Sequence, residues 1–395
     1  MKKNQLVCIA FPKWEGDYLK STVQLMKYLA SEYDILYVDY PYTWSDVIKS
    51  WFGTRQFPVK KILGIEKRME SVKTINDAKV NLLRLPPIIP MNWAKSHFVY
   101  NLIARINSKL LLPYVRKAMK QLGFENPAVF NAFQPWLGHL WKGKLDESQT
   151  IYYCYDEMSA APWISKHGPL MEKKFITEAD QVIVTSSALR QIKSQLNPRV
   201  SIVKNGVDEA IFGVPSRQSK RSHPLMKNQK VVGYIGSIDD RLDTELLNQL
   251  ISSLADHRFQ FVGRIVCSNT AKELSRHANV TLPGPMDPSQ LPHQLDEMDV
   301  CIIPFKTNKL TAAIYPLKIN EYLFRGKPVV TTRFADLSDF EEIVSVATNT
   351  NTFITQVQYQ LSSKDQSQIQ KRKEFAKSNT WKERAASLQE ILDRA

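Results

Sequence analysis

Residues 302–332 read IIPFKTNKLTAAIYPLKINEYLFRGKPVVTT, and this stretch is the most informative segment of the chain. The apolar run that ends at Pro304 predicts a buried strand, and the segment that follows Pro316 predicts a helix. Gly326 is expected to end this helix, because glycine readily adopts the left-handed conformation that closes a helix, and a second apolar run follows it. A strand, a helix and a strand in this order predict a βαβ unit of a parallel sheet.

The same alternation extends over nearly the whole chain and predicts an α/β protein. Two doubly wound, Rossmann-like domains facing a central cleft are expected, because ligands of such sheets bind at the carboxyl ends of the strands. A stretch rich in Pro, Ser and basic residues after Gly206 predicts a linker between them. The expected strands are residues 6–11, 35–38, 128–130, 151–153, 182–185, 200–203, 231–235, 259–262, 300–304 and 328–331. The expected divisions are an N-terminal domain (1–207), a linker (208–229), a C-terminal domain (230–375) and a C-terminal helix (376–395) that packs back toward the N-terminal domain.

Composition excludes several classes of protein. The chain of 395 residues has 53 Lys and Arg against 39 Asp and Glu, and its 43% of hydrophobic residues exclude a disordered tail. Residues 1–200 hold 28 of the basic and 17 of the acidic residues, so +11 of the net charge of +14 lies there. Such a positive field attracts phosphate groups on nucleic acid, lipid or substrate, and the charge alone does not indicate which of these the protein binds. The four cysteines lack C-x-x-C spacing and are expected to be reduced core residues.

Lys318 and Glu321 are the first candidate pair for binding chemistry. The start of a helix has unpaired amides and the positive end of the dipole, so a diphosphate is favoured there and Lys318 adds a full charge. One turn later, Glu321 can accept hydrogen bonds from vicinal hydroxyls such as those of a ribose. The alternative is an ordinary ion pair on the surface of a helix.

At these residues the chain resembles GT-B glycosyltransferases of family 4 and related bacterial polysaccharide transferases of the teichuronic-acid type. The family pattern P-x-K-x-x-E-Y-x-x-x-G-K-P-V-V is written here as PLKINEYLFRGKPVV, residues 316–330. Further segments follow in the family's order, namely YYCYDEMSA (152–160), EADQVIVTSSAL (178–189), VKNGVD (203–208), VVGYIGSIDDRLD (231–243) and the terminal helix with Trp381.

The resemblance implies a donor site in the C-terminal domain. It gives Glu321 the role of binding the ribose and Lys318 that of facing the diphosphate. Gly236 and Ser237 fall in a turn that approaches phosphate or sugar, because glycine has no Cβ to prevent this. Tyr315 is expected either to contact the donor or to pack beneath the helix. Arg264 is expected to help with the phosphate charge, together with Arg241, or to be a surface arginine.

Two departures from the family pattern concern the donor. Ala313 stands where many members have a glutamate that touches the donor sugar. Asp239 and Asp240 follow the glycine turn where many members have an Arg and a Lys. These differences leave the donor sugar and the retained or inverted stereochemistry undecided.

The N-terminal domain is expected to bind the acceptor. Asp156 follows a strand and is our candidate for the base that takes the acceptor proton, in preference to Glu157, with helix capping as the alternative role of Asp156. The loop FPKWEGDYLKS, residues 11–21, offers Trp14, Gly16 and Asp17 as acceptor contacts. Glu15 and Asp17 are rival bases, and Asp17 can instead cap a helix.

Together these features predict a hexosyltransferase that uses a nucleotide-diphosphate sugar, expected to be a UDP-sugar, and a glycan or lipid-linked acceptor in cell-surface polysaccharide or glycolipid synthesis. The nucleotide sugar is a co-substrate, and neither a cofactor nor a metal ion is expected. No apolar run reaches the roughly 18 residues of a membrane span, so we expect a cytoplasmic protein. Residues 95–120 are basic and amphipathic, and they predict either peripheral contact with an anionic membrane or a core helix that Pro113 interrupts. A GT-B nucleotide-sugar 2-epimerase or phosphorylase is the alternative, followed by a non-catalytic nucleic-acid-binding protein, although no nucleic-acid motif is present.

Overall fold

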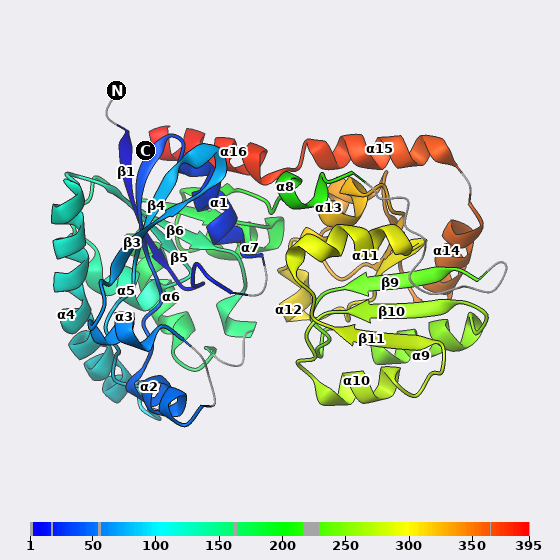
Figure 1. Ribbon diagram of the computed structural model, residues 1–395, viewed down its shortest axis with the longest axis horizontal. Coiled ribbons are helices and arrows are strands. Elements are labelled where there is room, and N and C mark those ends of the chain that lie inside the picture. Colours follow the sequence, from blue (N-terminus) through cyan, green and yellow to red (C-terminus); the bar gives the residue numbers. More distant parts are fainter. Residues whose placement is uncertain are drawn as a thin grey trace. The chain divides into compact units, whose positions relative to one another are not determined.

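The computed structural model describes residues 3–16, 19–53, 57–160, 164–215, 229–363 and 365–394. The chain divides into unit 1, Met1–Lys204 with Ala385–Ala395, and unit 2, Asn205–Arg384. Figure 1 shows that each unit is a β-sheet with helices packed around it. The first segment of unit 1 ends at Lys204, three residues before the predicted domain boundary at residue 207. The last residues of the chain, Ala385–Ala395, are also part of unit 1.

The sheet of unit 1 has the strand order β3-β4-β2-β1-β5-β6-β7-β8. Its neighbouring strands are parallel except for β3, which is antiparallel to β4 at the edge. The strands are β1 (Asn4–Ala10), β2 (Tyr33–Val38), β3 (Met69–Lys73), β4 (Lys79–Leu83), β5 (Ala128–Ala132), β6 (Gln149–Cys154), β7 (Gln181–Val184) and β8 (Val200–Ile202). The sequence did not predict β3 or β4. Both contain polar residues among the apolar ones, and β3 is partly exposed throughout, so neither shows the continuous apolar run of a buried strand.

Helices cover the sheet of unit 1, and the longest of them, α4, is continuous through Pro113. This corrects the expected interruption. Proline lacks an N–H and removes the partner of the Lys109 carbonyl, but both residues are exposed, so water can replace the lost bond. The helices are α1 (Ser21–Leu29), α2 (Trp44–Trp51), α3 (Val59–Leu63), α4 (His97–Leu122), α5 (Pro135–Trp141), α6 (Gly168–Glu178) and α7 (Ser187–Lys193), with 3-10 turns η1 (Ile75–Asp77) and η2 (Met158–Ala160).

The core of unit 1 lies between the sheet and the inner face of α4 and α5. Tyr100, Ala104, Leu111 and Val115 recur at helical spacing on α4 and are buried. They pack with strand residues and with buried tryptophans of α5, so about half of α4 faces the core and the other half is left to solvent.

The sheet of unit 2 is parallel, with the order β11-β10-β9-β12-β13-β14. Its strands are β9 (Val231–Ile235), β10 (Arg258–Val262), β11 (Val280–Gly284), β12 (Val300–Ile303), β13 (Val329–Thr332) and β14 (Ser345–Ala347). The edge strands β11 and β14 were not predicted, since β11 is partly exposed and β14 has three residues. The predicted central strands agree with β9, β10, β12 and β13 to within one residue.

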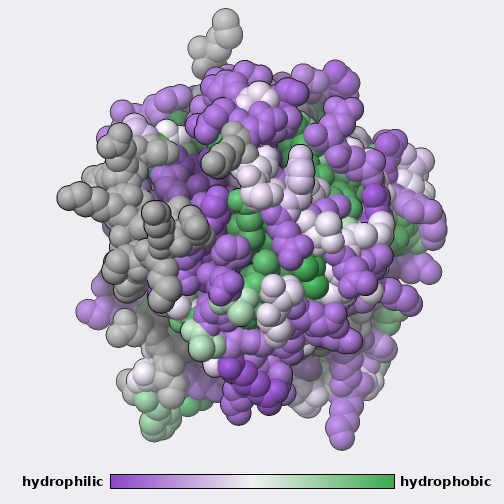
Figure 2. Space-filling model, turned by 90° about the vertical axis from the view of Figure 1, so that its right-hand side faces the viewer, coloured by the Kyte–Doolittle hydropathy of each residue, from purple (hydrophilic) through white to green (hydrophobic). Residues whose placement is uncertain are grey.

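The helices of unit 2 begin with α8 inside the predicted linker, of which residues 216–228 lie outside the described residues. They are α8 (Glu209–Phe212), α9 (Thr244–Ser253), α10 (Ser268–Leu274), α11 (Leu291–Glu297), α12 (Lys309–Ala312), α13 (Leu317–Phe324), α14 (Thr350–Ser362) and α15 (Gln366–Lys377), with 3-10 turns η3 (Pro288–Gln290) and η4 (Ser338–Phe340). Helix α16 (Trp381–Arg394) begins in unit 2, and its residues from Ala385 onward belong to unit 1. Figure 2 views the side of α14, where hydrophobic residues reach the surface in narrow strips between hydrophilic ones.

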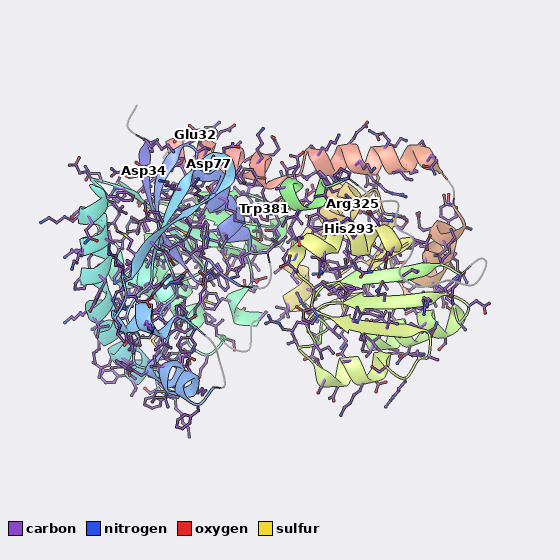
Figure 3. All side chains as sticks on the ribbon, viewed as in Figure 1. Glu32, Asp34, Asp77, His293, Arg325 and Trp381 are labelled. Atoms are coloured by element: carbon purple, nitrogen blue, oxygen red, sulfur yellow. The ribbon has the colours of Figure 1, made fainter. Side chains whose placement is uncertain are left out.

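The segment around Gly206 belongs to unit 2 because its backbone packs directly against the start of α16. Val207 N donates to the Asn379 carbonyl over 2.8 Å, and Trp381 N donates to the Val207 carbonyl over 3.0 Å. A Cβ on Gly206 would lie 2.6 Å from the Thr380 carbonyl carbon, so only glycine fits. Trp381, labelled in Figure 3, is buried next to this crossing. The last residues of α16 belong to unit 1, where the Tyr33 hydroxyl donates to Asp393 over 2.6 Å.

The cysteines are free thiols. Cys8, Cys154 and Cys301 are buried as predicted, and burial raises the pKa of each thiol. Cys267 is partly exposed, because it lies at the start of α10 and not in a core strand.

Candidate functional site

Helix α13 places Lys318 and Glu321 at the carboxyl end of the unit 2 sheet. Pro316 precedes the first helical residue, so Lys318 is the second residue of the helix, as the sequence predicted. The hydroxyl of Tyr322 accepts a hydrogen bond from Ile235 N over 2.8 Å and also contacts the Ile235 carbonyl at 3.2 Å. Since Ile235 ends β9, this tyrosine joins α13 to the strand end that precedes the glycine turn.

The far end of α13 is held by Arg325, which is labelled in Figure 3. Its guanidinium contacts both carboxylate oxygens of Asp296 at 3.1 and 2.5 Å and donates to the Phe212 carbonyl over 2.9 Å. Gly326 follows with a φ of +71°, as expected of a residue that closes a helix, and its N–H donates to the Leu323 carbonyl. Contacts with the end of β9 and with Asp296 of α11 therefore hold the helix in place.

Gly236 makes room for the Lys318 side chain. A Cβ at this position would lie 2.1 Å from Lys318 Cε and 2.7 Å from the Tyr234 hydroxyl. The φ of Gly236 is +155°, which side chains rarely adopt. Gly263 packs against it in the same way, since its Cβ would lie 2.0 Å from the Gly236 carbonyl oxygen. The two predicted donor residues Gly236 and Lys318 are thus in direct contact.

Aromatic rings surround the ammonium group of Lys318. Its Nζ lies 5.8 Å from the ring centroids of both Tyr234 and Phe305, which is within cation–π range. The guanidinium of Arg241 lies 5.3 Å from the centroid of the same Phe305 ring and pairs with Asp239 at 2.6 Å. The aspartates that depart from the family pattern are therefore partly explained, because Asp239 holds Arg241.

The environment shifts the pKa values of this pair toward neutral pH. Burial lowers the pKa of Lys318, the Arg241 charge lowers it further, and the charges of Glu321 and Asp239 oppose this. Burial likewise raises the pKa of Glu321, whose side chain is 8% exposed, and the Lys318 charge opposes the shift. Such a site gains from an anion near Lys318 and from hydroxyl donors near Glu321, which a nucleoside diphosphate supplies.

Of the other predicted donor residues, Ser237 follows Gly236 in the turn, and its carbonyl accepts a hydrogen bond from the Tyr234 hydroxyl over 3.0 Å. Tyr315 is buried, its ring lies 5.6 Å from that of Phe340, and burial raises its pKa to about 12. This placement favours the packing alternative for Tyr315. Arg264 is exposed just after β10, and its carbonyl accepts from Ile238 N. Ala313 is buried.

A cavity of about 360 Å³ opens beside Phe305 at the same end of the sheet. Its walls come from the carboxyl ends of β12, β13 and β14 and from the start of α9, and they include Thr332, Arg333 and Asn349. These residues had no signal in the sequence, because they follow three strands that are adjacent only in the folded sheet.

In unit 1, Asp156 lies two residues beyond β6 and is partly exposed. Its neighbour Glu157 is engaged locally, accepting hydrogen bonds from Ser159 N over 3.1 Å and from Lys193 Nζ over 2.9 Å. Burial alone would raise the pKa of Glu157, but the Ser159 hydrogen bonds and the Lys193 charge outweigh it and hold this pKa below its usual range. Both carboxylate oxygens of Glu157 are therefore engaged, and Asp156 stays our candidate for the base.

Lys193 is a site residue that the sequence did not reveal. It is 2% exposed and also pairs with Glu172 over 2.9 Å, while Glu172 accepts from the Tyr152 hydroxyl over 2.8 Å. The network fixes the turn that carries Asp156 against α6 and α7. A lysine near the end of an ordinary amphipathic helix gives no indication of such burial.

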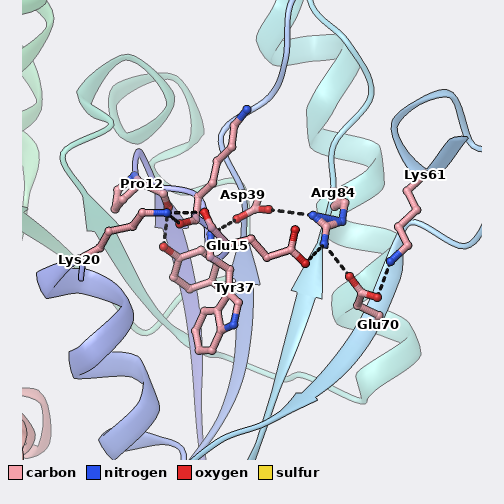
Figure 4. Close-up of polar contacts among 10 residues, drawn as sticks. Pro12, Glu15, Lys20, Tyr37, Asp39, Lys61, Glu70 and Arg84 are labelled. Atoms are coloured by element: carbon pink, nitrogen blue, oxygen red, sulfur yellow. Dashed lines mark hydrogen bonds and ion pairs between the residues drawn. The ribbon is translucent and has the colours of Figure 1, made fainter. Parts of the chain in front are cut away.

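The predicted acceptor loop lies at the carboxyl end of β1, where Figure 4 shows a second charged network. Trp14 N donates to Asp39 over 2.9 Å, and the Trp14 ring packs edge-on against Tyr37 at 5.1 Å. Lys20 Nζ donates to the carbonyls of Lys13 and Glu15 and closes the loop. Gly16 is exposed with a φ of +147°, whereas Asp17 lies outside the described residues.

Arg84 is the centre of this network. It is 5% exposed and contacts Glu70 at 2.7 Å, Glu15 at 2.9 Å and Asp39 at 3.5 Å. Burial raises the pKa of Asp39, against the opposing effects of the Trp14 N–H and the Arg84 charge. The sequence signal for Arg84 was a single basic residue directly after the run NLL, which cannot reveal partners as far as 69 positions away.

Among the described residues, no group of three or more His, Cys, Asp or Glu side chains is arranged to hold a metal ion. Metal independence stays a prediction.

Comparison with known families connects this geometry with glycosyl transfer. Residues 229–362 match the family described as Glycosyl transferases group 1. Over 211 residues, 49% of this chain, the sequence is 31% identical to TuaH of Bacillus subtilis (strain 168), which is assigned as a teichuronic acid biosynthesis glycosyltransferase. The alignment covers 53% of TuaH, so the chain matches about half the length of this curated relative. The predicted resemblance is confirmed.

Solved structures share the fold over the whole chain. Sucrose-phosphate synthase from Thermosynechococcus elongatus is similar with a TM-score of 0.72 at 15% identity, covering 99% of both chains. HepE of Anabaena, in complex with UDP and glucose, is similar with a TM-score of 0.65 at 12% identity, covering 100% of both chains. At these identities the likeness establishes the fold, and the predicted GT-B class is confirmed.

Proposed function

We propose that this chain, which carries a glycosyl transferases group 1 domain at residues 229–362 within a GT-B fold, is a glycosyltransferase. Its donor is a nucleotide-diphosphate sugar, of which UDP-sugars are the first choice, and its acceptor is a hydroxyl of a glycan or lipid-linked carbohydrate. The relationship to TuaH supports a role in cell-surface polysaccharide synthesis.

The contact of Lys318 with Gly236 at the start of α13 carries this proposal. Lys318 would neutralise the diphosphate as the bond to the sugar breaks, and Glu321 would hold the ribose hydroxyls. A cation already placed where leaving-group charge develops stabilises the transition state without reorganisation. HepE binds UDP on the same fold, which supports the choice of nucleotide.

In unit 1, Asp156 would accept the proton of the attacking hydroxyl, and the loop with Trp14 and Gly16 would contact the acceptor. The ring of Trp14 offers an apolar face suited to a sugar ring. Arg84 and Asp39 would set the position of this loop without touching the acceptor.

A lipid-linked acceptor would bring the enzyme to the inner face of the cytoplasmic membrane as a peripheral protein. Within the part of the chain that the structure describes, no helix has the length and hydrophobicity needed to cross a bilayer.

A thermal-shift screen with UDP-, GDP-, ADP- and dTDP-sugars tests the donor assignment. A ligand present at one hundred times its dissociation constant adds about 2.7 kcal/mol to the free energy of unfolding, so a true donor raises the melting temperature. Glu321→Gln should keep the fold and lose most of the shift. The matched control Lys371→Gln changes an exposed residue of α15 and should retain it. The proposal fails if none of these nucleotide sugars shifts the wild-type protein.

A further inference from the structure

Exposed apolar side chains gather on one part of unit 1. Phe52 is 80% exposed, Phe98 76% and Trp93 66%. We call the following set the apolar face: Trp44, Ile48, Phe52, Leu63, Ile65, Ile89, Trp93, Phe98, Leu102, Ile106, Leu110 and Tyr114. Outside it, the exposed large apolar residues among the described part of unit 1 are Leu170 and Ile192. Such a concentration marks an interaction surface, because isolated exposed apolar residues are otherwise scattered.

The elements that carry the apolar face are bonded to one another. Trp44 N, at the start of α2, donates to the Ile88 carbonyl over 3.0 Å. The next residue, Ile89, exchanges two hydrogen bonds with the Asn107 side chain of α4, at 3.0 and 2.9 Å. Arg68, which follows α3, lies 5.2 Å from the Tyr114 ring of α4. In Figure 1, α3 and α2 lie near the lower end of α4. The elements that carry the apolar face are therefore neighbours in the fold.

Along α4 the outer surface changes from apolar to basic. Phe98, Leu102 and Ile106 follow one another at a spacing of four residues and are exposed, so they form a stripe over the first turns of the helix. Lys109 and Lys117 continue on the same side and are also exposed. Residues 78–124 contain eight Lys and Arg and no Asp or Glu. Apolar residues next to basic ones, without acids, are the composition of a helix that lies in a membrane interface.

We propose that the apolar face docks on an anionic lipid bilayer, with its Trp, Phe, Leu and Ile side chains in the interface and the basic residues of α4 against acidic headgroups. The positive charge of α4 favours an anionic bilayer over a second copy of this chain as the partner of the apolar face. A second copy of this chain would bring two acid-free basic segments together, and their repulsion opposes a symmetric dimer. An anionic bilayer matches the positive charge and also accepts the aromatic rings, which favour the boundary between apolar chains and headgroups.

The apolar face borders the candidate acceptor loop. Lys13 Nζ lies over the Tyr42 ring at 2.7 Å from its centroid, and Tyr42 stacks on Phe57 at 4.5 Å. Tyr42 lies two residues before α2 and Phe57 two residues before α3, so both connect the loop to the docking surface. Provided that the proposed function is correct, a lipid-linked acceptor held in the bilayer would present its sugar to the loop that carries Trp14.

Vesicle flotation with the full chain tests the docking surface. The wild type should float with phosphatidylcholine vesicles that contain about 30% phosphatidylglycerol, and added salt should weaken this binding. Phe98→Ser with Leu102→Ser should lower the partition coefficient at least about tenfold, because two exposed apolar side chains no longer insert. Lys109→Gln with Lys117→Gln should lower it about tenfold on anionic vesicles only.

Matched controls use exposed residues away from the apolar face. Lys173→Gln with Lys174→Gln on α6 removes the same charge, Tyr359→Ser on α14 removes an exposed aromatic ring, and neither should change vesicle binding. Circular dichroism and melting temperature show that each variant is folded. The inference is overturned if the wild type does not float, if the variants float as the wild type does, or if sedimentation shows a dimer that Phe98→Ser with Leu102→Ser separates. The nucleotide-sugar thermal shift needs no lipid, so it fails or succeeds independently.

Discussion

At the carboxyl ends of its strands, unit 2 carries the ammonium group of Lys318 against glycine backbone and aromatic rings, whereas unit 1 encloses Arg84 and Lys193 in carboxylates. Burial lowers the pKa of Lys318, so the folded protein holds this charge at a cost that a bound anion would offset. The carboxylates around Arg84 and Lys193 have already balanced their charges. We propose on this basis that unit 2 receives a charged ligand and that the paired charges of unit 1 position its loops.

The largest effect is expected from breaking a paired charge in unit 1. Lys193→Met keeps the volume of the side chain but leaves Glu172 and Glu157 without their cation, which should lower the free energy of unfolding by about 3 kcal/mol or more in urea titrations. The control Lys173→Met, at an exposed position of α6, should change it by less than about 0.5 kcal/mol.

The pH dependence of the same variant shows whether charge is the cause. Because the wild-type pKa of Glu157 is lowered, its stabilising contribution is present above its ordinary pKa and is lost as pH falls through the lowered value. The difference between wild type and Lys193→Met should therefore shrink in acid. A loss of stability that is constant with pH would mean that Lys193 acts only through packing.

A smaller effect is expected from crowding Lys318 in unit 2. Gly236→Ala introduces a Cβ that collides with the Lys318 side chain and must move it, so the affinity for the nucleotide diphosphate should fall about tenfold or more in calorimetric titrations. Gly143→Ala is the matched control, because Gly143 also has a positive φ of +73° but has no atom within 4 Å of the added Cβ. Both substitutions strain the backbone, and only the first should weaken binding.

The smallest effect is a pH dependence of nucleotide binding. As pH rises, Lys318 loses its proton at a lower pH than an ordinary lysine, since burial lowers its pKa. UDP affinity should consequently decline in mildly alkaline solution. Lys318→Arg keeps its charge in alkaline solution, so its affinity for UDP should vary less with pH. If the two proteins show the same pH dependence, Lys318 does not bind the diphosphate.

Prediction from sequence was most successful where the signal is local. The interior strands of both sheets other than β4 follow from apolar runs, because hydrophobic burial on both faces of a strand requires neighbouring apolar residues, and the bounds of α13 follow from Pro316 and Gly326. The edge strands β3, β11 and β14 and the interior strand β4 were missed, because β3, β4 and β11 mix polar with apolar residues and β14 has only three residues. Pro113 was wrongly expected to break α4, since the cost of proline depends on whether water can reach the freed carbonyl.

The sequence by itself determined the α/β architecture, the basic charge of the first half and the pair Lys318 and Glu321 on one helix, because these depend on residues close together in the chain. The contact of Gly236 with Lys318, the pairing of Arg84 with Glu15, Asp39 and Glu70, and the exposure of the apolar residues on α2, α3 and α4 appear only in the folded chain. The order of the strands within each sheet brings these groups together. This order results from packing of the complete core and is not specified by any local sequence pattern.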